Sequence, residues 1–368
     1  MTTGEVVIRV FGISDVGRTR EHNEDAFVIA DLATAKPAPM PSASSREQTY
    51  EPGDRGALFM VADGMGGAAA GEIASSMAVD AVLGEMRMRW VEGPAGGDPV
   101  AFVEALRSAT QVANERIHGY ATDHPENRGM GTTATVAGVL GDTVYIAQVG
   151  DSRAYLIRDG QARQITKDQS LMQRLIEAGE ITAEEAEVSE RRNIILQALG
   201  PESYIKIDIT HQQLRRGDTL VLCSDGLSGV VRDTEIAEVV RSSADLVTIC
   251  QRLIARANEA GGPDNITAIA ASFDGDGLTA PGADDEVGHR QFPVGESTPV
   301  TPVPRVTTGE FSRAASVPVP DAEPRRVPTR EIVRPLDPST SGSPLTLLGA
   351  LAALVIVIAA VFLYLHRR

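Results

Sequence analysis

A short apolar run that ends at an aspartate beside glycine is the feature that most constrains the fold, and it recurs along the chain. The clearest case is LFMVADGMGGAAAGE, residues 58–72, in which the apolar run Leu58–Ala62 predicts a buried strand that Asp63 ends. The glycines that follow leave backbone and side-chain oxygens open toward one point. This pattern is typical of a site for a hard cation. The alternative is a tight turn in which Asp63 caps a helix that begins near Gly71.

Three other segments share this form: QVGDS at Asp151, LCSDG at Asp225, and GGPDN at Asp264, where the strand follows the aspartate. The segment HNEDAF adds Glu24 and Asp25 ahead of another strand. One such motif is a weak signal, because Asp and Gly are the commonest turn residues. Several carboxylates at the strand ends of one sheet, however, repel one another unless a cation offsets their charge. Oxygen ligands without His or Cys favour magnesium, manganese or calcium over zinc.

Hydrophobic periodicity elsewhere predicts strands that bracket pairs of helices, the order expected of an α+β layered sandwich. The predicted strands are residues 6–11, 26–30, 58–62, 131–140, 143–149, 154–158, 219–223 and 266–273. The predicted core-facing helices are residues 72–86, 99–120, 233–241 and 245–260. Prolines and serines in residues 36–56 predict a flexible insertion between two strands, and residues 165–200 predict a small helical flap.

The composition changes after residue 275. Of the 21 prolines in the chain, 12 fall between Pro281 and Pro344, and the aromatic residues there are limited to Phe292 and Phe311. Such a segment buries too little apolar surface to form a core. We therefore expect residues 276–343 to be a disordered linker rich in Pro, Thr and Ser.

The end of the chain predicts a single transmembrane helix at residues 344–366. Residues 345–365 form a run of 21 residues without a charge, long enough as a helix to cross the roughly 30 Å hydrocarbon layer. A buried core helix is the alternative, but only three residues follow and a polar linker precedes. Arginines on both sides of the run make the positive-inside rule a poor guide. The N-terminus has no signal-peptide pattern and the chain has only two cysteines, which favour a cytoplasmic catalytic domain tethered to the cell membrane.

The net charge of −16 argues against a nucleic acid partner, because no basic stripe accompanies it.

Six motifs in chain order carry a resemblance to a known family. They are RxxxED (Arg20, Glu24, Asp25), VADGMGG, GMGTT at residues 129–133, VGDSR, SDGL and GGPDNIT. Together they resemble the metal-dependent serine/threonine protein phosphatases of the protein phosphatase 2C type, and the bacterial branch matches best. The resemblance extends over residues 6–273 and implies a catalytic domain at residues 1–275. It also implies a four-layer αββα sandwich of two antiparallel sheets flanked by helices, with two divalent cations, Mn²⁺ or Mg²⁺, at one end.

The resemblance also implies roles for individual residues. Asp63 would bridge both cations; Glu24 and the Gly64 carbonyl would complete one, and Asp225 and Asp264 would hold the other. Asp151, with Ser152 beside it, matches a third cation position. Asp25 and Asn265 would support the ligands without touching a cation. Arg20 matches the arginine that binds the phosphate, for which its planar fork is suited.

The implied reaction is the hydrolysis of phosphoserine and phosphothreonine in proteins by a water that two cations activate, without a covalent intermediate. Some eukaryotic members have a histidine where this chain has Met65, so that position supplies no general acid. A serine/threonine kinase that acts on the same substrates, in bacterial signalling, is the implied partner. Two alternatives are a phosphatase of phosphorylated anti-sigma antagonists, whose usual sensor module is missing here, and a phosphoprotein-binding scaffold without turnover. The scaffold would be expected to have lost a metal carboxylate, and none is lost.

Overall fold

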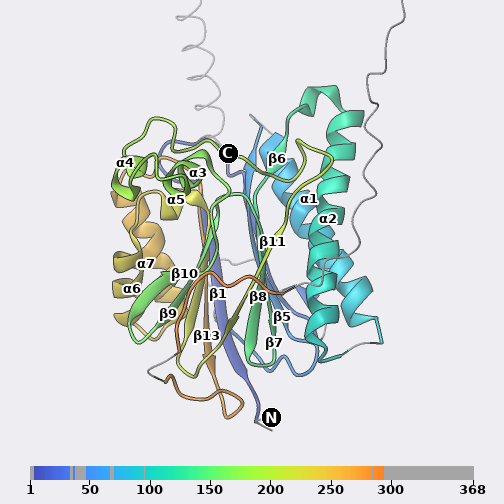
Figure 1. Ribbon diagram of the computed structural model, residues 1–368, viewed down its shortest axis with the longest axis vertical. Coiled ribbons are helices and arrows are strands. Elements are labelled where there is room, and N and C mark those ends of the chain that lie inside the picture. The colour runs from blue at the N-terminus through green and yellow to red at the C-terminus, as the bar shows by residue number, and fades with distance from the viewer. Residues whose placement is uncertain are drawn as a thin grey trace, which may run out of the picture. The chain divides into compact units, whose positions relative to one another are not determined.

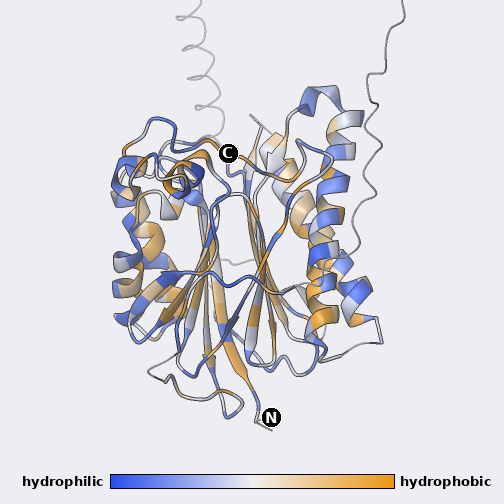
Figure 2. Ribbon diagram, viewed as in Figure 1, coloured by the Kyte–Doolittle hydropathy of each residue, from blue (hydrophilic) through white to orange (hydrophobic). Residues whose placement is uncertain are grey.

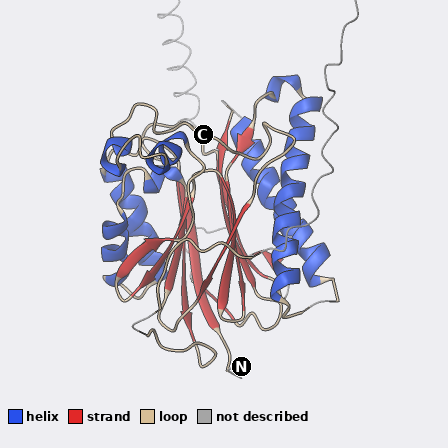
Figure 3. Cartoon of the chain, in the orientation of Figure 1, coloured by secondary structure: helices blue, strands red, loops and turns tan. Residues whose placement is uncertain are grey.

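The computed structural model describes residues 4–33, 36–37, 47–66, 70–94, 96–282 and 285–293. Within this part, two β-sheets face each other and helices cover the outer face of each sheet (Figure 1). The same layers are visible by secondary structure (Figure 3). The strand pairs of both sheets are antiparallel. The predicted architecture of two antiparallel sheets with flanking helices is therefore confirmed.

One sheet has seven strands. Across the sheet they are β11 (Asp208–Gln213), β8 (Thr143–Val149), β7 (Ala134–Leu140), β5 (Ala57–Met65), β2 (Asp25–Asp31) and β3 (Lys36–Pro37), with β6 (Gly131–Thr132) paired to the end of β5. The register of β2 with β5 places Asp25 opposite Asp63. Two acidic residues that are far apart in the sequence thus lie side by side at one end of this sheet.

The other sheet has six strands. Across the sheet they are β10 (Gln161–Gln164), β9 (Arg153–Arg158), β12 (Thr219–Cys223), β13 (Ile266–Asp274), β1 (Val7–Asp15) and β4 (Gln48–Tyr50). Cys223 at the end of β12 pairs with Arg153 at the start of β9 and with Ala268 near the start of β13. Asp225 follows β12, whereas Asp151 precedes β9 and Asp264 precedes β13. The register therefore brings these three aspartates to the same end of the sheet.

Apolar side chains from both sheets fill the space between them, which is the central core of the molecule. Phe59 and Val61 of β5 face Leu220 of β12 and Ile269 of β13 in this core, and all four are fully buried. Burial of each such side chain contributes roughly 1.5 to 3 kcal/mol, so the core fixes the two sheets against each other. Figure 2 shows apolar residues concentrated on the strands and hydrophilic residues on the outer sides of the helices.

Two pairs of helices form the outer layers. The helices α1 (Ala70–Met86) and α2 (Pro99–Asp123) cover the seven-stranded sheet, whereas α6 (Asp233–Arg241) and α7 (Leu246–Glu259) cover the six-stranded sheet. Small buried residues of α1, such as Ala74 and Ala78, let that helix approach the sheet closely. Asp98 caps α2 and Asp245 caps α7, because each side chain accepts a hydrogen bond from the first turn. These four helices agree with the sequence-based prediction.

The segment predicted as a flap, residues 165–200, carries the short helices α3 (Leu171–Glu177) and α4 (Ala183–Glu187). Ser170 caps α3, and Thr182 caps α4 in a capping box with Glu185. We call residues 165–200 the flap. Three further short elements are α5 (Asp225–Ser228), a π-helical turn (Arg87–Val91) and a 3₁₀ turn (Pro125–Asn127).

Several strand boundaries differ from the predictions. The prediction that Asp63 ends its strand is wrong, because β5 continues to Met65 through pairing of Gly64 and Met65 with β6. Asp225 does not end a strand either, because it begins α5. The edge strands β4, β10 and β11 were not predicted. Their sequences QTY, QARQ and DITHQQ are largely polar, so no apolar alternation marks them.

Residues 276–282 and 285–293 extend the packed domain beyond residue 275, after which the sequence predicted the linker to begin. Leu278 is 1% exposed and lies in the core between the sheets. The ring of Phe292 lies 5.5 Å from the rings of Tyr145 and His211, in edge contacts. Single apolar residues in a polar run do not form a pattern, which is why the sequence did not indicate this packing. We call residues 276–293 the C-terminal strap.

No helix in the described residues is long and apolar enough to cross a membrane. The apolar run at residues 345–365 and the predicted linker after residue 293 lie outside the described residues, and so does most of residues 36–46 in the predicted insertion.

Candidate active site

A pocket of about 460 Å³ opens at the end of the sandwich where the acidic strand ends meet. Its lining is mostly polar and comes from the loop after β1, the end of β5, the start of α5, the loop before β13, and the flap. These residues are Arg20, Glu21, His22, Glu24, Asp63, Gly64, Met65, Gly66, Asn193, Ile195, Asp225 and Asp264. Six residues predicted from the sequence as phosphate or metal ligands are therefore brought together: Arg20, Glu24, Asp63, Gly64, Asp225 and Asp264.

Asp151 lies in an adjoining groove of about 750 Å³ that shares residues with this pocket. The groove runs between the flap and the end of the six-stranded sheet. The residues common to both are Arg20, Asn193, Asp225 and Asp264. Asp151 therefore lies at the same end of the domain as the other predicted ligands, but it lines the groove that the flap borders.

The geometry at Gly64 explains why this position must be a glycine. A Cβ atom there would lie 2.2 Å from the Gly71 carbonyl oxygen and 2.5 Å from the Glu24 carbonyl oxygen. A Cβ at Gly71 would in turn lie 2.8 Å from the carboxyl group of Glu24. Only glycines let the end of β5, the first turn of α1 and the Glu24 loop approach so closely. The helix N-terminus also favours the negative charge of Glu24.

Burial and mutual repulsion disfavour ionisation of the clustered carboxylates. Burial, followed by the charges of Asp25 and Asp225, raises the pKa of Asp63 well above its ordinary value. Burial likewise raises the pKa of Asp25 to about 7, despite hydrogen bonds from two hydroxyl groups. Burial, followed by the charge of Asp225, raises the pKa of Asp151 to about 7. Burial and the charge of Asp264 also raise the pKa of Asp225. A bound cation would reverse this preference.

The donor set fits a divalent cation bound through oxygen. Among the described residues, the buried oxygens Asp25 Oδ1 and Asp151 Oδ1 have no hydrogen-bond partner. No three His, Cys, Asp or Glu side chains in the described part form one compact metal-binding group. An ion such as Mg²⁺ fits this arrangement, because it keeps several waters and is held by few carboxylates. The position of Asp63 in the pocket favours the cation interpretation over a helix cap.

Two threonines, Thr132 and Thr133, fix the backbone of Asp63. The Asp63 N–H donates to Thr133 Oγ1 at 2.9 Å, and the Asp63 carbonyl accepts from the Thr133 N–H at 2.9 Å. Thr132 Oγ1 donates to the same carbonyl at 2.9 Å. Thr133 Oγ1 also lies 2.7 Å from Ser152 Oγ, which links Asp63 to the Asp151 loop. The motif GMGTT was noticed in the sequence, but its threonines were not predicted as site residues.

Ser152 faces the protein with both of its oxygens. Its hydroxyl contacts Thr133, and its carbonyl accepts from Gln148 Nε2 at 2.7 Å and from Thr135 Oγ1 at 3.0 Å. Ser152 is also fully buried. These contacts hold the Asp151 loop in place, and the expected position of Ser152 beside a third cation stays a prediction.

Asn265 holds the loop that carries Arg20 and Glu24. Its side chain accepts from the Glu24 N–H at 2.8 Å and donates to the carbonyls of Val16 and His22, each at 2.9 Å. One amide therefore ties three points of this loop to the start of β13, and its predicted role in supporting metal ligands stays a prediction.

Asp25 lies behind the pocket, where it was expected, and has two hydroxyl partners that were not predicted. Asp25 Oδ2 accepts from Ser224 Oγ at 2.7 Å and from Thr267 Oγ1 at 2.6 Å. These hydroxyls come from the other sheet, so only the packing of the two sheets reveals them.

Arg20 points into the pocket and is held by Asp264. Arg20 Nη2 lies 2.7 Å from Asp264 Oδ2. Burial by itself lowers the pKa of Arg20, but the hydrogen bond and charge of Asp264 raise it above its ordinary value. Arg20 is thus a cation at all accessible pH values beside three carboxylates.

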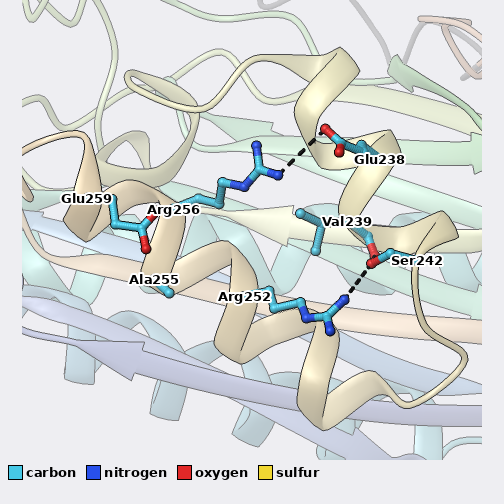
Figure 4. A pocket seen from close by; sticks show the side chains of 7 residues that line it. All are labelled: Glu238, Val239, Ser242, Arg252, Ala255, Arg256 and Glu259. Atoms are coloured by element: carbon cyan, nitrogen blue, oxygen red, sulfur yellow. Dashed lines mark hydrogen bonds and ion pairs between the residues drawn. The ribbon is translucent and has the colours of Figure 1, made fainter.

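A separate pocket of about 270 Å³ lies between α6 and α7 (Figure 4). Its arginines are paired within the pocket: Arg252 Nη1 donates to Ser242 Oγ at 2.8 Å, and Arg256 Nη2 lies 3.6 Å from Glu238 Oε2. None of the predicted site residues lines it.

An αββα sandwich that gathers acidic oxygen ligands and one arginine at an end of its sheets defines a metal-dependent phosphate-cleaving enzyme. Comparison with known proteins gives the family, because the family model described as Protein phosphatase 2C matches residues 35–266. The chain belongs to the protein phosphatase 2C family, and is a metal-dependent serine/threonine protein phosphatase.

Individual relatives agree with this assignment. The chain is 37% identical over 271 residues to the serine/threonine phosphatase Stp of Listeria monocytogenes, covering 74% of this chain and 97% of the relative. It is 35% identical over 266 residues to the serine/threonine protein phosphatase PstP of Mycobacterium tuberculosis, covering 72% of this chain and 45% of PstP. A crystal structure of the PstP catalytic domain with two manganese ions is similar, with a TM-score of 0.57 at 34% identity, covering 73% of this chain and 99% of that one.

Proposed function

We propose that this chain removes phosphate from phosphoserine and phosphothreonine residues of proteins by direct attack of water, with Mn²⁺ or Mg²⁺ bound at the acidic end. The observation that carries the proposal is the convergence on one pocket of Arg20 and acidic residues from four separate segments. The acidic residues are Glu24, Asp63, Asp225 and Asp264.

Two cation positions follow from how these residues lie. Glu24 and the Gly64 carbonyl are next to each other at the first turn of α1, so we assign them to one cation. Asp225 and Asp264 are close enough for the charge of one to raise the pKa of the other, so we assign them to the second cation. Asp63 adjoins both groups and would bridge the cations. We assign Asp151 to a third, separate position in the adjoining groove.

Bound cations would supply a low-pKa water and offset the charge of the phosphoryl oxygens. The residues of the chain then bind and orient the substrate. Arg20 offers a planar fork that suits two phosphoryl oxygens, and its hydrogen bond to Asp264 fixes its position. Met65 in the floor of the pocket carries no ionisable proton, so the proton for the leaving alkoxide comes from another group or from water.

Three residues would hold the ligands in place without binding a cation. Asn265 fixes the backbone of Glu24, and Asp25 joins the two sheets through Ser224 and Thr267. We propose that Ser152 has this supporting role as well, because its hydroxyl and carbonyl are both hydrogen-bonded inside the protein.

The reaction is tested with a phosphothreonine peptide, a phosphotyrosine peptide and p-nitrophenyl phosphate, each with added Mn²⁺ or with EDTA. We expect release of phosphate from the phosphothreonine peptide and p-nitrophenyl phosphate with Mn²⁺, and none with EDTA. Asp63→Asn and Asp225→Asn should each abolish most of the activity, whereas Gln111→Met on the exposed face of α2 should not change it. Equal activity of Asp63→Asn and the unchanged protein would refute the site, and an inactive unchanged protein would favour the scaffold alternative.

We also propose that the apolar run at residues 345–365 anchors the chain in the cell membrane through a linker that begins after residue 293, with the phosphatase domain in the cytoplasm. The uncharged length of the run supports the anchor, and two free, buried thiols suit a reducing compartment. Membrane fractions from cells that express the full chain should retain it after alkaline carbonate extraction, unlike a chain that ends at residue 343. Release of the full chain by carbonate would refute the anchor.

The physiological substrates would then be phosphoproteins of a serine/threonine kinase at the same membrane. Phosphoproteomes of cells with the unchanged chain and with Asp63→Asn test this proposal. We expect serine and threonine sites to gain phosphate in the variant, and no gain at any such site would contradict it.

A further inference from the structure

The flap forms one wall of the groove beside the acidic site. Met172 and Ile176 of α3, with Ala186 of α4, line the groove opposite Asp151 and Asp225. The position of the flap therefore decides the shape of the groove in which residues next to the phosphorylated residue of a protein substrate would lie. A contact that fixes both ends of the flap would therefore affect the binding of protein substrates more than the binding of small phosphate esters.

Gln169, near the start of the flap, is paired with Gly150, the residue before Asp151. The Gln169 N–H donates to the Gly150 carbonyl at 2.9 Å, and the Gly150 N–H donates to Gln169 Oε1 at 3.0 Å. Gly150 has φ +99°, and a Cβ atom there would lie 2.7 Å from the Thr133 side chain. This position of the loop therefore requires a glycine. The start of the flap is thus joined to the loop that carries Asp151.

The same residue also holds the end of the flap. The Leu196 N–H donates to the Gln169 carbonyl at 2.7 Å. Gln169 Nε2 donates to the Lys206 carbonyl at 3.2 Å and to the Gln148 carbonyl at 3.4 Å. These hydrogen bonds use the N–H, the carbonyl and both polar side-chain atoms of Gln169, and they join Gln169 to three other chain segments.

We propose that Gln169 is a positioning residue that fixes both ends of the flap to the Gly150–Asp151 loop. Its side-chain acceptor holds Gly150, its side-chain donor contacts Gln148 and the segment that follows the flap, and its backbone carbonyl holds the end of the flap at Leu196. Gln169 would fix the shape of the groove that binds a protein substrate, while touching neither the phosphate nor a cation. This kinetic part of the inference rests on the proposed phosphatase activity.

Two substitutions separate these contacts. Gln169→Met keeps the length of the side chain and removes the side-chain hydrogen bonds. The backbone hydrogen bonds of residue 169 remain. Gln169→Glu keeps the acceptor for the Gly150 N–H and removes the donors to the Lys206 and Gln148 carbonyls. Gln111→Met is the matched control, because Gln111 lies on α2 and its side chain donates to the exposed side chain of Glu115.

Hydrogen exchange of backbone amides in the full chain tests the structural part. In Gln169→Met we expect roughly tenfold faster exchange at Gly150 and at residues 194–207, as loss of the side-chain hydrogen bonds of Gln169 predicts. In Gln169→Glu we expect faster exchange at residues 194–207 but not at Gly150. Unchanged exchange in both variants would overturn the proposal, and so would equal acceleration across the whole domain, which indicates global destabilisation. If Gln169→Met does not fold, the exchange pattern of Gln169→Glu decides.

Kinetics with Mn²⁺ tests the functional part. For Gln169→Glu we expect KM for a phosphothreonine peptide to rise by roughly threefold or more, while kcat/KM for p-nitrophenyl phosphate stays within about twofold. Equal losses with both substrates would overturn the role in shaping the groove. If the unchanged protein hydrolyses neither substrate, the proposed function fails, whereas the exchange experiment still decides whether Gln169 positions the flap.

Discussion

Replacing Leu278 by alanine tests whether the C-terminal strap belongs to the folded domain. Leu278 is 1% exposed and lies among the core residues between the two sheets, so the substitution would leave a cavity there. Substitutions of this kind cost roughly 2 to 5 kcal/mol of unfolding free energy. For a domain of this size each kcal/mol lowers Tm by about 2 to 4 °C, which predicts a decrease of roughly 4 to 20 °C.

The assay is calorimetry of the chain ending at residue 293, with urea unfolding as a second measure. Val188→Ala is the control, because Val188 is 82% exposed and its loss should cost no more than about 0.5 kcal/mol. A chain ending at residue 275 should also be less stable, because it lacks Leu278 and the Phe292 contacts. If Leu278→Ala costs less than about 0.5 kcal/mol, the strap is not packed in solution and the domain ends near residue 275 as the sequence predicted.

Three further predictions concern the acidic site. Because the pKa values of Asp25 and Asp151 are raised to about 7, the folded metal-free protein binds protons that the unfolded chain releases above about pH 4. The stability of the folded protein should therefore fall as the pH rises between about 4 and 7. In EDTA, Tm should be lower at about pH 8 than at about pH 5.5, and Asp151→Asn should reduce this difference in Tm. A Tm that rises with pH would contradict this prediction. Thr133→Val leaves the Asp63 N–H without its acceptor and should cost about 1 to 3 kcal/mol in urea unfolding, whereas Thr133→Ser should cost much less; equal stability of the two variants would exclude this role for the hydroxyl. Arg20→Lys should lower kcat/KM for a phosphothreonine peptide by roughly tenfold, because an ammonium group does not replace a bidentate fork, and an unchanged value would show that Arg20 does not bind the phosphate.

The residues predicted to provide the chemistry could be selected from the sequence, because each of them stands in a local motif. An aspartate beside glycine at a strand end is visible within five residues, and the order of six motifs indicated the family. The structure gathers Asp63, Asp225 and Asp264 in one pocket, as the motifs required.

Asp25 and Asn265 were predicted as supporting residues, but the side chains that contact Asp25 and the flap contacts of Gln169 could not be predicted in the same way. Thr267 of β13 and Ser224, just after β12, contact Asp25 of the other sheet, and Gln169 donates to the carbonyl of Lys206, 37 residues further along the chain. Nothing in the local sequence distinguishes a glutamine with such contacts from one on a solvated surface. Their roles depend on contacts between distant segments, which only the packed sheets and the flap create.

The boundaries of the domain were hard to predict for a related reason. The edge strand β11 is polar on most of its length, and the strap that pairs with it at Thr210 and Gln291 is polar too. Their pairing is a backbone interaction, which leaves no hydrophobic alternation in either segment.

Binding of Mn²⁺ and phosphate release, measured on the same samples, test the central claim most directly. The account predicts that the chain ending at residue 293 binds about two Mn²⁺ ions tightly, that hydrolysis of a phosphothreonine peptide rises with their occupancy, and that Asp63→Asn loses both together, because one carboxylate would serve both cations. Hydrolysis that persists in Asp63→Asn, or tight Mn²⁺ binding that is unchanged by this substitution, would contradict it.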